Sequence, residues 1–158
     1  MGTTTGGQAS VRGEKPGMGT ALLALMAALT GALPLLSTNA YAVAGSYSSE
    51  ASGPVMHNRN AWYTSMHPTV GSPPRNSKIT TVSWRWGVSR QDPGLEVKLC
   101  YRSANDCVSV TSYGKAMTQA FAGRPAEGAF LLMYRVAGTG RMTPINGERS
   151  QVIVNYTY

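Results

Sequence analysis

The sequence predicts an all-β protein: a single small β-sandwich or open barrel of about six to seven short antiparallel strands. First, apolar and polar residues alternate along several short runs, most clearly over residues 79–89. Second, 18 glycines and 9 prolines in 158 residues supply frequent turns. Third, no long amphipathic helical pattern occurs after the first 42 residues. Short strands separated by regular turns are typical of sandwiches and open barrels.

The first 42 residues predict a cleaved export signal. An apolar run at residues 21–36 follows a basic flank and precedes the small-residue site Ala40-Tyr41-Ala42. We expect cleavage after Ala42, or after Ala44 at an overlapping site. A transmembrane anchor is the alternative, but it needs about 20 apolar residues, which is longer than this run. The mature protein is therefore expected to be exported and to keep no stable membrane anchor.

The mature chain is expected to contain one domain. Residues 43–60 are rich in Ser, Gly and Asn, and we interpret them as a flexible leader. Residues 61–158 then form the β-domain. The predicted strands are residues 61–66, 79–89, 95–100, 107–111, 115–121, 129–136 and 152–158.

Each predicted strand follows from its pattern. Residues 79–89 place Val82, Trp84, Trp86 and Val88 on one face. Residues 115–121 fit either a helical turn or a strand. The strand is favoured because Met117, Gln119 and Phe121 alternate on one face and a Gly-Arg-Pro sequence soon ends the run. The nearly continuous apolar run at residues 129–136 is typical of a strand buried on both faces.

Cys100 and Cys107, the two cysteines of the chain, predict a disulfide across a β-hairpin. Six residues separate them, which matches neither the C-x2-C spacing of metal sites nor that of redox sites. If Cys100 pairs with Cys107 in an antiparallel hairpin, Leu99 faces Val108, and the apolar residues share one side. The hydrophobic register and the cysteine register therefore agree. Export to an oxidising compartment favours the same pairing.

The sequence does not carry the residue pattern of an enzyme. His57 and His67 lie in segments expected to be solvated, and the carboxylates lie in the leader, in turns or on an exposed strand face. No nucleophile, zinc or phosphate-binding motif occurs. We therefore expect no catalytic activity, no cofactor and no bound metal.

Two groups of residues are candidates for binding. Trp62, Trp84 and Trp86 provide an aromatic platform for sugar rings if they are exposed, whereas same-face tryptophans more commonly fill a core. The chain also has an excess of cations, with 14 Lys and Arg against 7 Asp and Glu. This excess suits an acidic partner, or it is scattered surface charge. Export argues against a nucleic-acid partner.

Several separated blocks carry a resemblance to a known family. They are Trp84-Arg85-Trp86, PGLEVKLC at residues 93–100, Cys107-Val108, residues 120–123, GRMTPI at residues 140–145 and VIVNY at residues 152–156. In this order the blocks resemble the flagellar protein FlhE family of Gram-negative bacteria, over roughly residues 80–158.

The resemblance implies a periplasmic, non-enzymatic accessory of flagellar assembly on a β-sandwich scaffold. Such a protein acts as a chaperone or plug: it limits proton leak through the flagellar export apparatus, prevents periplasmic flagella and supports swarming. Its implied partners are export-gate, rod or filament-type subunits. The alternative is a periplasmic glycan- or peptidoglycan-binding module that uses Trp84 and Trp86.

Two surfaces are candidates for contact with such partners. The C-terminal strand, with Val152, Val154 and Tyr156, suits β-augmentation on the hypothesis that it lies at a sheet edge. Arg85, Arg135 and Arg141 are candidates for contacts with an acidic partner.

Overall fold

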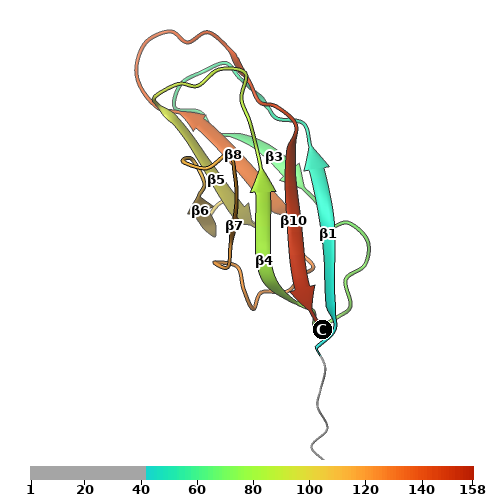
Figure 1. The fold of residues 1–158 in the computed structure, drawn as a ribbon. Coiled ribbons are helices and arrows are strands. Elements are labelled where there is room, and N and C mark those ends of the chain that lie inside the picture. Colours follow the sequence, from blue (N-terminus) through green and yellow to red (C-terminus); the bar gives the residue numbers. More distant parts are fainter. Residues whose placement is uncertain (1–41) are drawn as a thin grey trace, which may run out of the picture. The chain divides into compact units, whose positions relative to one another are not determined.

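The structure, a computed structural model, describes residues 42–158. The signal segment predicted over residues 1–42 therefore lies outside the described residues, apart from Ala42 itself. In the described part, two four-stranded antiparallel sheets face each other as a sandwich, and a two-stranded sheet adjoins them (Figure 1). Among the described residues, no helix has the length and apolar character needed to cross a membrane.

Ten strands make up the fold. They are β1 (Ala44–Ala51), β2 (Val55–Met56), β3 (Tyr63–His67), β4 (Lys78–Arg85), β5 (Leu95–Tyr101), β6 (Cys107–Ser109), β7 (Lys115–Thr118), β8 (Phe130–Val136), β9 (Ile145–Asn146) and β10 (Ser150–Thr157). One sheet has the order β1-β10-β4-β7 and is called the β10 sheet here. The other has the order β3-β8-β5-β6 and is called the β8 sheet. The short strands β2 and β9 pair with each other.

The prediction of an all-β sandwich is confirmed, but the strand count is higher than the predicted six to seven. The strands that were not predicted are β1, β2 and β9. The two-residue strands β2 and β9 are too short to show a period in the sequence. The ambiguous segment at residues 115–121 does form a strand, β7, over its first four residues.

The interpretation of residues 43–60 as a flexible leader is wrong. Residues 44–51 form β1, which pairs with β10 over eight consecutive residues. The strand was missed because only Tyr47 and Ser49 are buried on its inner face, and its other residues are small or polar. Backbone hydrogen bonds to β10, rather than apolar side chains, hold this segment in the sheet.

The hypothesis that the C-terminal strand lies at a sheet edge is also wrong. β10 lies between β1 and β4 and pairs with both. The error follows from the missed strand, because β1 covers the side of β10 that was expected to be open. The edges of the β10 sheet are β1 and β7 instead.

The hairpin of β5 and β6 has the predicted register. Cys100 lies opposite Cys107, and Leu99 lies opposite Val108. The two cysteines form a disulfide. The agreement of the hydrophobic and cysteine registers in the sequence therefore identified both the hairpin and its crosslink.

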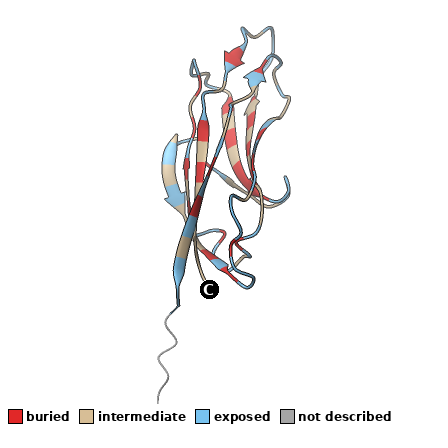
Figure 2. Ribbon diagram, turned by 90° about the vertical axis from the view of Figure 1, so that its right-hand side faces the viewer, coloured by how far each residue is buried: buried red, intermediate tan, exposed pale blue. Residues whose placement is uncertain are grey.

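The core fills the space between the two large sheets. The largest fully buried side chains include Tyr134, Phe121 and Phe130, and Trp86 packs edge-on against Tyr134 at 6.2 Å between ring centroids. Buried residues alternate with partly exposed ones along β8 and along much of β4 (Figure 2). Burial raises the pKa of Tyr134 to about 12, so its hydroxyl stays neutral.

His67 joins the two sheets inside the core, whereas the sequence predicted a solvated loop residue. The side chain is 1% exposed. Its Nδ1 donates to the carbonyl oxygen of Ser49 at 3.1 Å, and its Nε2 lies within hydrogen-bond distance of the Ser150 hydroxyl, at 3.1 Å. The prediction failed because β3 extends one residue beyond the expected strand and turns this side chain inward. Burial lowers the pKa of His67, although the hydrogen bond to Ser49 opposes the shift.

Candidate functional site

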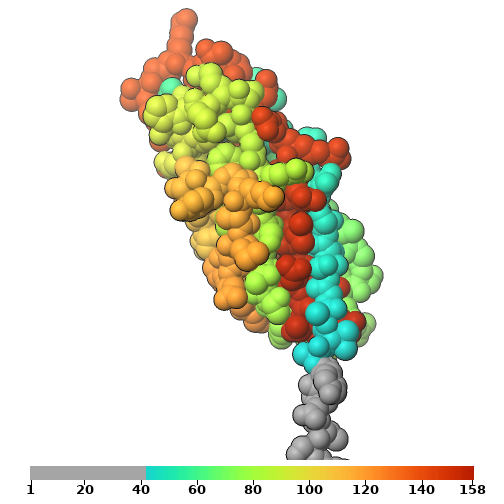
Figure 3. Space-filling model, in the orientation of Figure 1, coloured from blue at the N-terminus to red at the C-terminus, as the bar shows by residue number. Residues whose placement is uncertain are grey.

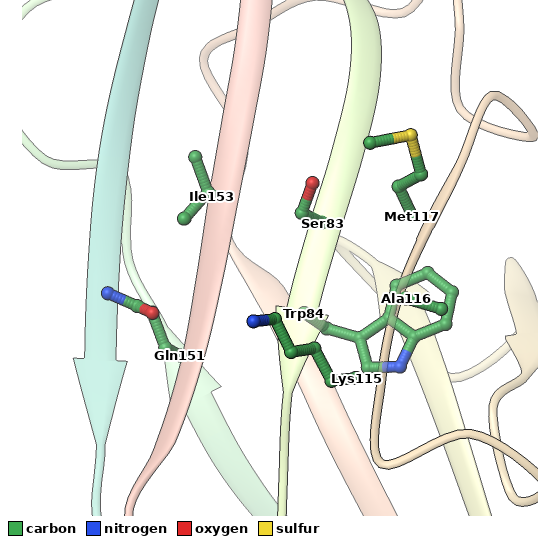
Figure 4. Close-up of a pocket in the computed structure, with 7 residues that line it drawn as sticks. All are labelled: Ser83, Trp84, Lys115, Ala116, Met117, Gln151 and Ile153. Atoms are coloured by element: carbon green, nitrogen blue, oxygen red, sulfur yellow. The ribbon is translucent and has the colours of Figure 1, made fainter.

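The outer face of the β10 sheet carries an apolar pocket, called the Ile153 pocket here. Figure 4 shows the seven residues that line it: Ser83, Trp84, Lys115, Ala116, Met117, Gln151 and Ile153. Ser83 lies opposite Ile153 on one neighbouring strand and opposite Met117 on the other. Because serine is the smallest of the three, a hollow of about 310 Å³ forms above it. The pocket thus results from a small residue between two larger apolar ones.

The pocket is open to solvent on the face that Figure 3 presents, where β7, β4, β10 and β1 lie side by side. Met117 is 69% exposed, which is unusual for a large apolar side chain. Methionine is flexible and polarisable, so it adapts to apolar groups of different shape. The pocket therefore suits an apolar side chain of a binding partner.

Two cations lie at one end of the Ile153 pocket. Arg85 on β4 and Lys115 on β7 occupy directly opposite positions, and both are exposed. We call them the cation pair. Among residues 42–158, the ion pairs that form within 4 Å involve neither of them. Like charges directly opposite on two strands are destabilising, so the fold itself gains nothing from this arrangement.

A nearby carboxylate does not relieve the cation pair. Gln151 on β10 lies between Arg85 and Glu50 in the same cross-strand row. Glu50 is instead paired with Arg149, at 3.0 Å between Nε and Oε2. The row therefore leaves the charges of Arg85 and Lys115 available to an outside carboxylate.

The outer face of the β8 sheet is arranged differently. Arg135, opposite Glu96, forms an ion pair with both carboxylate oxygens, at 2.7 and 2.9 Å. The guanidinium of Arg135 also lies over the Trp62 ring, 4.8 Å from its centroid, and the Nζ atom of Lys98 lies 5.0 Å from that centroid. Arg135 and Trp62 are therefore engaged by residues of the chain itself.

The predicted aromatic platform does not form. Trp84 and Trp86 are each 7% exposed, and their Nε1 groups donate to the carbonyl oxygens of Tyr113 and Val110. Trp62 lies on the β8 sheet side of the molecule instead. Trp84 and Trp86 are buried in the core, as favoured for same-face tryptophans, and backbone carbonyls satisfy their indole nitrogens, so the alternative of an exposed three-tryptophan platform is wrong.

The other predicted partner-binding residues do not converge either. Val152 and Val154 are buried at 1% and 0% exposure, so an intact fold does not present them to a partner. Tyr156 is half-buried, and its ring lies 6.4 Å from that of Tyr47. Arg141 is exposed in the loop between β8 and β9. Of the predicted partner-binding residues, only Arg85 adjoins the Ile153 pocket, and Trp84 from the predicted aromatic platform lines it.

Most residues of the Ile153 pocket were not predicted from the sequence. Ser83, Lys115, Met117, Gln151 and Ile153 were not named as candidates, although alternation had placed Met117 on one face of the segment at residues 115–121. Their convergence depends on the order β10-β4-β7, which the sequence does not reveal. Within the described part of the chain, no cluster of three His, Cys, Asp or Glu side chains is placed to hold a metal ion.

Comparisons with known proteins place the chain in a family. The family model described as "Flagellar protein FlhE" matches residues 53–157. The flagellar protein FlhE of Salmonella typhimurium is 36% identical over 94 residues, which cover 58% of this chain and 70% of that protein. The FlhE protein of Yersinia enterocolitica is 35% identical over 83 residues, and this alignment spans 51% of the chain but only 57% of its relative.

A solved structure supports the same relationship. The structure titled "Crystal Structure of FLHE" superimposes with a TM-score of 0.63 at 29% identity, and the match covers 73% of this chain and 98% of that one. The disulfide is consistent with a protein that resides in an oxidising compartment. Sequence, family model and fold agree: the chain belongs to the FlhE family of flagellar proteins.

Proposed function

We propose that this protein is a periplasmic, non-enzymatic accessory of flagellar assembly. It acts as a chaperone or plug that limits proton leak through the flagellar export apparatus, prevents flagella from forming in the periplasm and supports swarming. The observation that carries the proposal is the family match over residues 53–157, which spans nearly the whole described domain.

Three features of the molecule support this role. The disulfide between Cys100 and Cys107 suits an oxidising compartment such as the periplasm. The domain carries an exposed apolar pocket beside uncompensated cations, which suits contact with another protein. Among the described residues, the carboxylates lie in ion pairs or at scattered surface positions and do not lie together in a cleft. The proposed partners are therefore protein subunits of the export gate, the rod or the filament.

Deletion of the gene in its native host tests the proposal. We expect thin sections of the deletion strain to show flagella in the periplasm, and swarming to be impaired. A copy that encodes residues 1–158 should restore both, whereas a copy without residues 1–42 should restore neither, because its product stays in the cytoplasm. Normal flagella and normal swarming in the deletion strain would contradict the proposed function.

A proton-leak measurement separates the plug from the chaperone. The cytoplasmic pH of the deletion strain is followed after a shift to acidic medium, in cells that contain the export gate and in cells that lack it. A plug predicts faster acidification that disappears when the gate is absent. A chaperone predicts unchanged acidification together with periplasmic flagella.

A further inference from the structure

We propose that the outer face of the β10 sheet is a docking site for an acidic segment of a partner protein. One apolar side chain of that segment occupies the Ile153 pocket, and its neighbouring carboxylates bind the cation pair, Arg85 and Lys115. That the partner is a flagellar protein rests on the proposed function; that the segment is acidic and carries an apolar side chain rests on the site alone.

The apolar half of the site has the size of a side chain. The hollow of about 310 Å³ lies at the lower limit of small-molecule pockets, which run from about 300 to 1,000 Å³. It lies over Ser83 on the outer face of the sheet, with Ile153 on one side and Met117 on the other (Figure 4). A long acyl chain needs a deeper or longer cavity, whereas one leucine or phenylalanine side chain fits. The occupant is therefore a projecting side chain of a protein.

The charged half of the site indicates which residues lie next to that apolar side chain in the partner. Arg85 and Lys115 are directly opposite each other, exposed, and without an ion-pair partner among the described residues. A carboxylate placed between them would relieve their repulsion and gain two charge-assisted contacts. An uncompensated pair of like charges next to an exposed apolar pocket is thus complementary to an apolar residue with Asp or Glu beside it.

Two simpler explanations account for only part of the site. A lysine on an edge strand discourages unwanted strand pairing, and Lys115 lies on the edge strand β7. This protective role does not explain Arg85, which lies on the interior strand β4. A single exposed methionine also needs no explanation, but Met117 here lies opposite Ser83 at the rim of a formed pocket.

The site can be tested by photo-crosslinking in the native host. The photoreactive residue p-benzoylphenylalanine replaces Met117 at the pocket, or Met66 on the outer face of the β8 sheet as a matched control. Met66 is 62% exposed and also lies on a strand. We expect an adduct from position 117 that maps by mass spectrometry to an acidic segment of a flagellar protein, and a yield at least tenfold lower from position 66.

Charge reversal provides the second arm of the experiment. The double variant Arg85→Glu/Lys115→Glu should lower the adduct yield from position 117 at least tenfold. The control double variant Arg75→Glu/Arg90→Glu changes the net charge equally at exposed positions outside the β10 sheet, and it should leave the yield unchanged. A third variant, Ser83→Leu, fills the pocket without changing charge and should also lower the yield. Thermal melts of each purified variant confirm that it is folded.

Several outcomes overturn the inference. They are no adduct from position 117, equal yields from positions 117 and 66, an adduct only with a second copy of this chain or with a cell-wall fragment, and a yield that the Arg85→Glu/Lys115→Glu variant does not change.

Failure of the docking site can be distinguished from failure of the proposed function. If this double variant still rescues the deletion strain fully, the docking site is wrong while the flagellar role stands. If the deletion strain has no flagellar defect but the adduct maps to an acidic segment of another protein, the site stands and the flagellar role is wrong.

Discussion

Arg135 and Arg85 project from opposite outer faces of the same sandwich, and their surroundings differ. Arg135 pairs with Glu96 across the strand and lies over Trp62. Arg85 faces Lys115 and lies beside an open apolar pocket. The disulfide further crosslinks the Arg135 face at Cys100 and Cys107. On the outer face of the β8 sheet, the charged and aromatic groups thus contact one another. On the outer face of the β10 sheet, two cations and an apolar pocket stay open to a partner.

This difference predicts different consequences for substitution on the two faces. Changes on the β8 sheet should reduce stability, because they remove contacts within the chain. Changes on the outer face of the β10 sheet should reduce binding and leave stability nearly unchanged. The following predictions test that comparison, beginning with the largest expected effect.

Loss of the disulfide should have the largest effect on stability. The double variant Cys100→Ser/Cys107→Ser should lower the free energy of unfolding by about 2.5 kcal/mol, because the crosslink closes a short loop in the unfolded chain. Urea denaturation of the variant and the oxidised wild type measures the difference. Equal midpoints for the two proteins would show that the crosslink does not stabilise this face.

Trp62→Ala should lower the free energy of unfolding by about 1–2 kcal/mol. Each of its two contacts with a cation contributes about 0.5–1 kcal/mol at a partly exposed site. Met117→Ala on the other face should change stability by less than about 0.5 kcal/mol, as expected for an exposed side chain. The comparison of the two outer faces fails if Met117→Ala is the more destabilising of the two variants.

Acidification should destabilise the fold through His67, the buried side chain that connects the two sheets. The pKa of His67 is lowered in the folded protein, so the unfolded chain binds a proton more readily than the folded chain does. The contribution of His67 to stability is therefore fully present above its unfolded pKa near 6.5 and is lost as the pH falls through the folded pKa. The loss is at most about 1.4 kcal/mol for each pH unit. Urea denaturation at pH 7.5 and pH 5.5 measures it.

The control for this prediction is His67→Gln, which keeps a polar side chain of similar size but does not titrate in this range. Its free energy of unfolding should depend less on pH between 7.5 and 5.5 than that of the wild type. The same pH dependence in both proteins would assign the effect to other groups.

Arg135→Ala should have a smaller effect, a loss of about 0.5–1 kcal/mol. The pair with Glu96 is about one-third exposed on both sides, which limits its contribution through solvent screening. The double-mutant cycle with Glu96→Ala isolates the coupling energy. A coupling of zero would mean that the pair contributes nothing to this face.

The sequence was sufficient wherever a local pattern determined the structure. The alternation in β5 and β6 and the spacing of the cysteines identified the hairpin, its register and its disulfide, because all three depend on neighbouring residues. The alternation of Val82, Trp84 and Trp86 similarly placed these residues on one face, which is buried.

The sequence was insufficient where backbone pairing or long-range order determined the structure. β1 has few apolar residues and is held by hydrogen bonds to β10, more than 90 positions away in the chain. Without β1, the C-terminal strand was taken for an edge, and Val152, Val154 and Tyr156 were taken for residues that contact a partner. The Ile153 pocket likewise depends on three strands that are not consecutive in the chain.

The free energy of unfolding of Arg85→Glu tests most directly whether the cation pair serves a partner rather than the fold. Glutamate at this position would face Lys115 and replace a like-charge pair with an opposite-charge pair. We expect stability equal to that of the wild type or higher by up to about 1 kcal/mol. A loss of more than about 1 kcal/mol would contradict it and would make Arg85 a residue that the fold itself requires.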